Sequence, residues 1–307
     1  MGVDPESLVR AARQGEVAVL AAETVPALRE SLAPAVQRQR RVDALLELGL
    51  ARAARALGAA GLVRVALLKG SAAAAWVYPE TAWRMRRDLD LLVGEQLVEV
   101  RRALLGDGWA DDVSPKYRPL GPERSRAWPM VVNLGQNKVS LDLHRTLVEP
   151  RDAWSHPSPD RILDEAVPGR SALPVSSLRD TALHTVLHLA NSGFHEPLKG
   201  WVDLWRLVPR VAPESLAERA REHGLRVATH ACLAVVERWF GIATRAHREA
   251  LDLPRWRSLP VEFLTSGEGE TPERRPLPRG WSRRLWRTVL GDVPHLRSLL
   301  PTRLIEA

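Results

Sequence analysis

The chain has 307 residues, of which 45% are hydrophobic and 26% are charged. These proportions are ordinary for globular proteins and exclude a largely disordered chain, and the length allows one large domain or two modest ones. No apolar stretch reaches the roughly 18 residues that a membrane-spanning helix needs, and a single cysteine, Cys232, excludes an internal disulfide framework. We therefore expect a cytoplasmic protein with no membrane partner.

The net charge of +7 raises the question of a nucleic-acid partner. Only four of the 44 basic residues are lysines, however, and the arginines are scattered among acidic residues, as in Arg151-Asp152 and Arg221-Glu222. Such mixed charge is typical of solvated helix faces. The charge alone therefore does not indicate that nucleic acid is the principal partner.

The first half of the chain mixes helical and strand patterns. Apolar residues at helical spacing predict helices over residues 1–60. Further on, the pattern predicts a strand over 63–68, a helix over 72–78 with Ser71 as its N-cap, a strand over 88–93, a helix over 95–105, and a hairpin of 128–134 and 138–143. This is the pattern of a small mixed α/β unit.

The second half reads as helical. Prolines 157, 159, 168 and 174 mark a connecting segment, and the clearest helical patterns beyond it cover 177–190, 200–208, 215–223 and 226–240. We therefore predict an α+β fold with three segments: N-terminal helices over 1–60, an α/β core over 61–150, and a helical domain over 175–307.

Three aspartates carry the first chemical signal. Asp88 and Asp90 are two residues apart on a predicted strand, so their carboxylates share one face, about 6 to 7 Å apart along the chain. Asp142 lies on another predicted strand, and His144, two residues further on, shares its face. We expect His144 to hydrogen-bond to a metal-binding carboxylate. Such oxygen ligands suit Mg²⁺, or Mn²⁺, when substrate phosphates complete the coordination. Solvation of the acids, or pairing with arginines 84, 86 and 87, are the alternatives.

Residues upstream of these acids suit a phosphate chain. Gly70 permits close approach of the backbone, and a helix that begins at Ser71 would point its amide groups at a triphosphate. Lys69 and Lys199 are notable because arginine is the usual cation of this chain, and a lysine offers a compact point charge for phosphate.

The order of these motifs resembles a known family. LLKGS, then Tyr78-Pro79, then Arg84 four residues before DLDLLV, and then LDLH resemble a bacterial family of uncharacterised nucleotidyltransferases in the DNA polymerase β-like superfamily. The helical segment LHTVLHLANSGFHEPLKGWVDLWRLV, which contains His188, Lys199 and Asp203, is similar to the family's second signature. The resemblance covers about residues 40–210.

The resemblance implies a fold and a set of roles. It implies a polymerase β-like sheet with flanking helices, in which Asp88 and Asp90 bind metal, Asp142 completes the site and assists deprotonation of the acceptor, and Gly70 and Ser71 hold the nucleotide phosphates. Arg84 is expected to help bind the nucleotide, and His188 and Asp203 to support the site indirectly.

The implied activity is metal-dependent transfer of a nucleoside monophosphate from a nucleoside triphosphate, with ATP as the expected donor, to an acceptor hydroxyl or amine. Two alternatives remain. The first is a tailoring or toxin-like enzyme of the same fold that acts on a peptide, a protein or RNA. The second is an inactive nucleotide-binding scaffold, because Arg86 and Arg87 stand where a smaller polar residue is more usual and could neutralise the acids.

Overall fold

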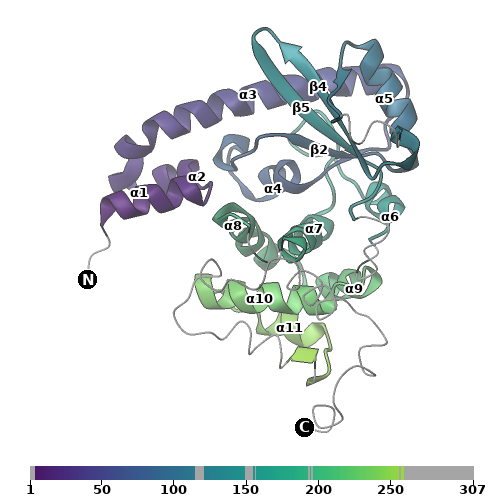
Figure 1. Cartoon of the computed structure of the whole chain (residues 1–307). Coiled ribbons are helices and arrows are strands. Elements are labelled where there is room, and N and C mark those ends of the chain that lie inside the picture. The colour runs from purple at the N-terminus through teal and green to yellow at the C-terminus, as the bar shows by residue number, and fades with distance from the viewer. Residues whose placement is uncertain are drawn as a thin grey trace. The chain divides into compact units, whose positions relative to one another are not determined.

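A five-stranded mixed sheet forms the centre of the N-terminal part of the chain. The structure, a computed structural model, describes residues 4–114, 121–148, 155, 157–192, 194, 196–255 and 257–258. The strands are β1 (Ala66–Leu67), β2 (Leu89–Leu92), β3 (Ala110–Asp111), β4 (Ala127–Leu134) and β5 (Asn137–His144). Their order across the sheet is β1-β2-β5-β4-β3, and the β2–β5 pair is parallel whereas the other pairs are antiparallel. Two strands distant in sequence are therefore neighbours at the middle of the sheet (Figure 1).

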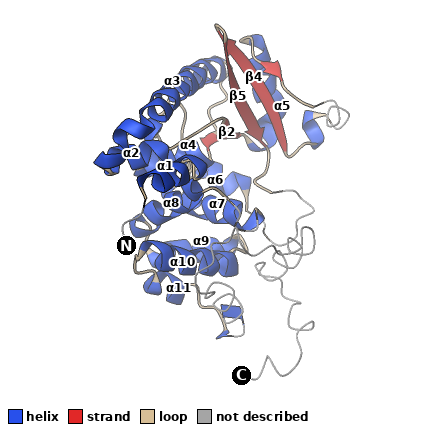
Figure 2. Cartoon of the chain, turned by 60° about the vertical axis from the view of Figure 1, so that its left-hand side comes forward, coloured by secondary structure: helices blue, strands red, loops and turns tan. Residues whose placement is uncertain are grey.

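Along the chain, the described helices come before, between and after the strands of this sheet (Figures 1 and 2). They are α1 (Pro5–Gln14), α2 (Ala18–Thr24), α3 (Arg29–Ala59), α4 (Lys69–Val77), α5 (Leu97–Gly106), α6 (Pro159–Asp164), α7 (Leu178–Asn191), α8 (Leu198–Leu207), α9 (Pro213–Glu222), α10 (Arg226–Phe240) and α11 (Arg245–Ala250). No helix in the described ranges is long and apolar enough to cross a membrane.

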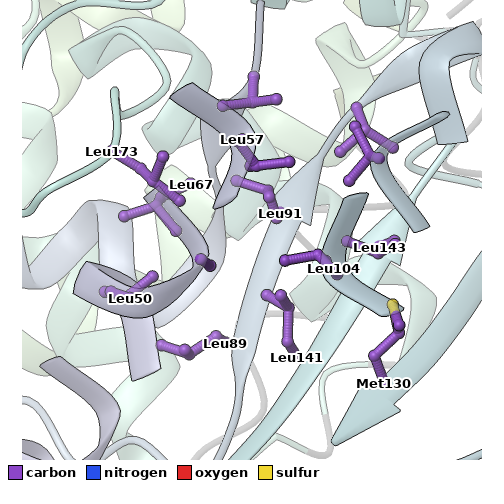
Figure 3. Close-up of a cluster of buried hydrophobic side chains, with 14 of the residues drawn as sticks. Leu50, Leu57, Leu67, Leu89, Leu91, Leu104, Met130, Leu141, Leu143 and Leu173 are labelled. Atoms are coloured by element: carbon purple, nitrogen blue, oxygen red, sulfur yellow. The ribbon is translucent and has the colours of Figure 1, made fainter. Parts of the chain in front are cut away.

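One face of the sheet is covered by α3, α4 and α5. Alternate residues of β2 and β5 point into this core because side chains two apart on a strand share a face. Figure 3 shows the cluster, whose labelled members are Leu50, Leu57, Leu67, Leu89, Leu91, Leu104, Met130, Leu141, Leu143 and Leu173. Packing of these leucines fixes the register of β2 and β5, and so leaves the intervening residues on the opposite face.

The chain divides into two compact units. The first contains residues 1–149, 158–177 and 197–199, and the second contains residues 150–157, 178–196 and 200–307. The N-terminal helices α1 to α3 are thus grouped with the sheet, and the first residues of α8 are grouped there too. The described part of the second unit is helical (Figure 2).

The α+β class that the sequence predicts is confirmed, and so is the hairpin, in which Leu134 pairs with Asn137 across a turn containing Gly135 at φ 63°. The three predicted segment limits stay a prediction, and 259–307 lies outside the described residues.

The predicted N-cap at Ser71 is wrong. The helix begins at Lys69, three residues before the predicted start at residue 72, and the Ser71 hydroxyl accepts a hydrogen bond from Arg86 instead of capping the helix. The first turn therefore contains Lys69, Gly70 and Ser71 together.

Candidate active site

The parallel β2–β5 pair brings two of the predicted acids side by side. Asp90 lies directly opposite Asp142 in the register, and Leu92 lies opposite His144. Asp88 comes immediately before β2 and lies outside the strand. Asp90 is buried, Asp142 is half-buried and Asp88 is exposed. The face opposite the leucine core therefore carries Asp90 and Asp142 from two strands, and Asp88 is near enough for its charge to act on both.

Asp90 is the anchored member of this group. Its Oδ1 accepts a hydrogen bond from Nε2 of His144 at 2.8 Å and another from Nζ of Lys69 at 2.5 Å. Burial acts to raise the pKa of Asp90, but the hydrogen bond from His144 and the charge of Lys69 outweigh it and hold this pKa well below its usual range. Asp90 is therefore a firmly ionised carboxylate at neutral pH.

Asp142 and Asp88 behave in the opposite way. The pKa of Asp142 is raised, first by burial and then by the negative charge of Asp90, with a further contribution from Asp88. The pKa of Asp88 is raised by partial loss of hydration and then by Asp90, while Lys69 and Lys199 act to lower it. The three carboxylates are thus close enough to repel one another, and their negative charge is incompletely compensated.

This donor set suits a hard divalent cation. Among the described residues, Asp90, Asp142 and His144 can each offer a ligand atom within 4.8 Å of the others. The two carboxylates are ligands that Mg²⁺ and Mn²⁺ prefer, whereas an imidazole is not a preferred ligand of Mg²⁺. Because Nε2 of His144 is hydrogen-bonded to Asp90, His144 orients Asp90 in this structure, and its buried Nδ1 has no hydrogen-bond partner among the described residues. Asp88 is not a member of that ligand group, but its charge interacts with that of Asp90.

The predicted phosphate-binding residues lie beside the acids. The first-turn amides of a helix have no carbonyl partner earlier in that helix, and here they belong to Lys69, Gly70 and Ser71. Arg84 packs against this turn, since the point where a Cβ of residue 70 would lie is 3.4 Å from its Nη1. Lys69 connects the start of α4 to the strand acids, because its ammonium group is hydrogen-bonded to Asp90. The structure therefore gathers Lys69, Gly70, Ser71 and Arg84 at one helix start.

Lys199 reaches the same region through an acid that the sequence did not single out. Its ammonium group pairs with Glu16, which follows α1 and has a positive φ of 56°. The backbone N–H of Lys199 donates to the carbonyl of Gly15 at 2.9 Å. The charge of Lys199 opposes the rise in the pKa of Asp88 that burial and Asp90 cause, so the two groups interact across this part of the first unit.

The two arginines next to Asp88 are engaged with other acids. Arg86 donates to Asp43 and Glu47, and Arg87 donates to Glu16. The cation that pairs with Asp90 is Lys69. One signal for the first pairing was present in the sequence, because Asp43 is three and seven residues before Leu46 and Leu50 on an otherwise apolar helix stripe.

His188 and Asp203 belong to the second unit. Nε2 of His188 lies 3.3 Å from Oε1 of Glu196, and its side chain is half-exposed. Asp203 is buried within α8. Their predicted support of the site stays a prediction.

The comparisons with known proteins agree with this arrangement of motifs. Residues 2–241 match the family described as uncharacterised nucleotidyltransferase. This match spans more than half of the chain, so the protein belongs to that family, and the resemblance that the motifs predict is confirmed. The family assigns the chain to the nucleotidyltransferases, whose donor is a nucleoside triphosphate. No curated protein and no solved structure matches the chain.

Proposed function

We propose that this protein is a metal-dependent nucleotidyltransferase with a polymerase β-like site, which transfers a nucleoside monophosphate from a nucleoside triphosphate, ATP being the expected donor, to an acceptor hydroxyl or amine. The observation that carries the proposal is the register of the parallel pair, in which Asp90 lies opposite Asp142. Asp88, immediately before β2, adds a third negative charge that acts on both. Family membership supplies the class of reaction.

The carboxylates would hold Mg²⁺ or Mn²⁺, with Asp90 and Asp142 as ligands and Asp88 completing the acidic face. When bound, such an ion neutralises charge on the phosphates and lowers the pKa of an attacking hydroxyl. His144 would keep Asp90 oriented, as the hydrogen bond to its Oδ1 indicates.

The triphosphate would lie along the start of α4. Backbone amides of Gly70 and Ser71 can donate to phosphate oxygens, and the positive end of the helix dipole favours the anion. Arg84 beside Gly70 and Lys69 beside Asp90 would add positive charge at the two ends of this turn. Lys199 is the further cation that this proposal assigns to the phosphates.

In the transfer step, the acceptor oxygen or nitrogen forms a bond to the α-phosphorus while the bond from the α-phosphorus to the bridging oxygen breaks. Pyrophosphate leaves with that electron pair. Asp142 is the residue that would take the acceptor's proton, because its carboxylate is half-buried beside Asp90 and has no fixed role in orienting a neighbour. The reaction thus divides the acids between an anchored ligand, Asp90, and a partner, Asp142, that also accepts a proton.

The test is release of pyrophosphate from each of the four nucleoside triphosphates with Mg²⁺ or Mn²⁺, in the presence of small-molecule, peptide and RNA acceptors. Asp90→Asn and Asp142→Asn should each reduce the rate by more than about 100-fold, because even indirect partners of metal ligands cost 10- to 100-fold. Asp164→Asn is the matched control, since this exposed aspartate pairs with Arg64 elsewhere on the first unit. Equal rates for the wild type and the Asp90 and Asp142 variants would refute the assignment.

One observation favours an inactive nucleotide-binding module as the second candidate. The ammonium group of Lys69 is hydrogen-bonded to Asp90 Oδ1, and a metal ion bound to Asp90 would compete with Lys69 for this carboxylate. Calorimetry of ATP binding with and without Mg²⁺ separates the two functions. A metal ion that strengthens ATP binding supports the enzyme, whereas metal-independent binding without turnover supports the module.

A further inference from the structure

Arg86 is a fully enclosed cation next to the candidate site. Its side chain is only 1% exposed. Nη2 donates to Asp43 and, at 2.7 Å, to Oε1 of Glu47, and Nη1 donates to Oγ of Ser71 at 3.2 Å. A buried charge of this kind persists only where it is paired and hydrogen-bonded, and both of its terminal nitrogens meet that condition.

These contacts join three separate segments of the first unit. Asp43 and Glu47 lie one turn apart on α3, Ser71 lies in the first turn of α4, and Arg86 itself comes two residues before Asp88. Two further bonds reinforce the junction: Thr81 Oγ1 donates to Asp43 at 2.7 Å, and Gln39 donates to the backbone carbonyl of Arg86 at 3.4 Å. The aliphatic stem of Arg86 also lies against Gly70, with Cγ 3.5 Å from where a Cβ there would be.

The direction of the bond to Ser71 has a chemical consequence. A hydroxyl group has one proton to donate and two lone pairs that accept. Since Arg86 can only donate, it occupies a lone pair of Ser71 Oγ and leaves the hydroxyl proton available for an anion. The same contact restricts the side-chain rotation of Ser71, so the donor is oriented before a ligand arrives.

We propose that Arg86 is a positioning residue for the nucleotide: through Asp43 and Glu47 it is held on α3, and through Ser71 it orients the hydroxyl that donates to a phosphate of the triphosphate. This inference rests on the proposed function, because it takes the phosphates to lie at the start of α4. It assigns to Arg86 neither neutralisation of the strand acids nor direct contact with the substrate.

The test is a double-mutant cycle on binding of ATP with Mg²⁺, measured by calorimetry. The first arm is Ser71→Ala. The second arm is the triple variant Arg86→Met, Asp43→Asn, Glu47→Gln, which removes the whole ionic group and leaves no buried charge unpaired. Each arm should weaken ATP binding by roughly tenfold, the effect of losing one hydrogen bond to a charged group. Combined, they should weaken it little more than either alone, because Arg86 acts through Ser71.

A merely structural Arg86 predicts something else. The two arms would then be additive, or the triple variant would lower thermal stability with ATP affinity unchanged, and either result overturns the inference. Arg55→Met, at an exposed position of α3, is the control and should keep wild-type affinity. Arg86→Lys provides a variant that keeps the charge, and it should also weaken ATP binding because a lysine cannot bridge the acids and Ser71 at once.

Failure of this inference is distinct from failure of the proposed function. If the wild-type protein binds none of the nucleoside triphosphates, the proposed function falls and this inference falls with it. If the wild type binds ATP with Mg²⁺ and Ser71→Ala weakens that binding equally in both backgrounds, only the inference about Arg86 falls.

Discussion

Two clusters of charge lie within the first unit, and they are compensated differently. In the Arg86 cluster, one guanidinium group satisfies Asp43, Glu47 and the hydroxyl of Ser71. On the strand face, Lys69 and His144 hydrogen-bond to Asp90, while the pKa values of Asp88 and Asp142 are raised by burial and then by the charge of Asp90. The cluster whose acids both pair with one cation joins segments together, whereas the strand face, where repulsion among carboxylates remains, is suited to bind an ion.

The largest expected effect on stability comes from removing the cation of the Arg86 cluster. Arg86→Met alone should destabilise the protein by about 3 to 5 kcal/mol, because it leaves Asp43 as an unpaired buried charge. Urea denaturation measures this loss. The triple variant Arg86→Met, Asp43→Asn, Glu47→Gln should recover most of it, because it leaves no charge of the group behind. A single variant as stable as the wild type would show that the cluster contributes no structural link.

On the strand face, we expect smaller changes in stability, and we expect them to have opposite signs for Asp90 and Asp142. Asp90→Asn should cost about 1.5 to 3 kcal/mol, because it weakens charge-assisted bonds from Lys69 and His144. Asp142→Asn should instead raise the melting temperature of the metal-free protein, since the raised pKa of Asp142 means that folding disfavours its ionised form. Melting temperatures measured in the presence of a chelator test this prediction. Shifts of the two melting temperatures in the same direction would contradict it.

The smallest expected effect is a pH dependence. Where a folded-state pKa is raised, the folded protein binds the proton first, so stability from Asp142 increases as pH falls from neutral towards the unfolded value of about 3.9. Where it is lowered, as for Asp90, the stabilisation is present above that value and is lost as pH falls below it. The difference in melting temperature between wild type and Asp142→Asn should therefore shrink between pH 7 and pH 4. A constant difference would argue against the raised pKa.

The fold was predictable where local patterns are strong. Alternating residues gave the strands around Asp90 and Asp142, and apolar spacing gave α10 to the residue, Arg226–Phe240. The two-residue strand β3 and the six-residue helix α6 were not predicted, because elements so short carry no periodic signal and depend on their tertiary neighbours.

The candidate site was predictable in composition but not in its pairings. Two residues on separate strands can be predicted to share a face, but the parallel register that sets Asp90 against Asp142 is fixed by packing of the leucines. The position of Asp43 on the buried stripe of α3 was readable in the sequence, but its pairing with Arg86 was not, since the two are 43 positions apart along the chain. The pairings of Glu16 and Glu47 likewise become interpretable only once the helices are folded against the sheet.

The parallel pairing at the middle of the sheet has a consequence for how the protein acquires its chemistry. Asp90 and His144 are 54 positions apart, yet β4 and β5 form a hairpin through a tight turn. Short-range hairpins close within microseconds, whereas strands joined by a long excursion must first lose the entropy of the intervening loop. We therefore expect a nascent chain to build its hairpin early and to become competent for a metal ion only when β2 docks, so that ion binding reports completion of folding.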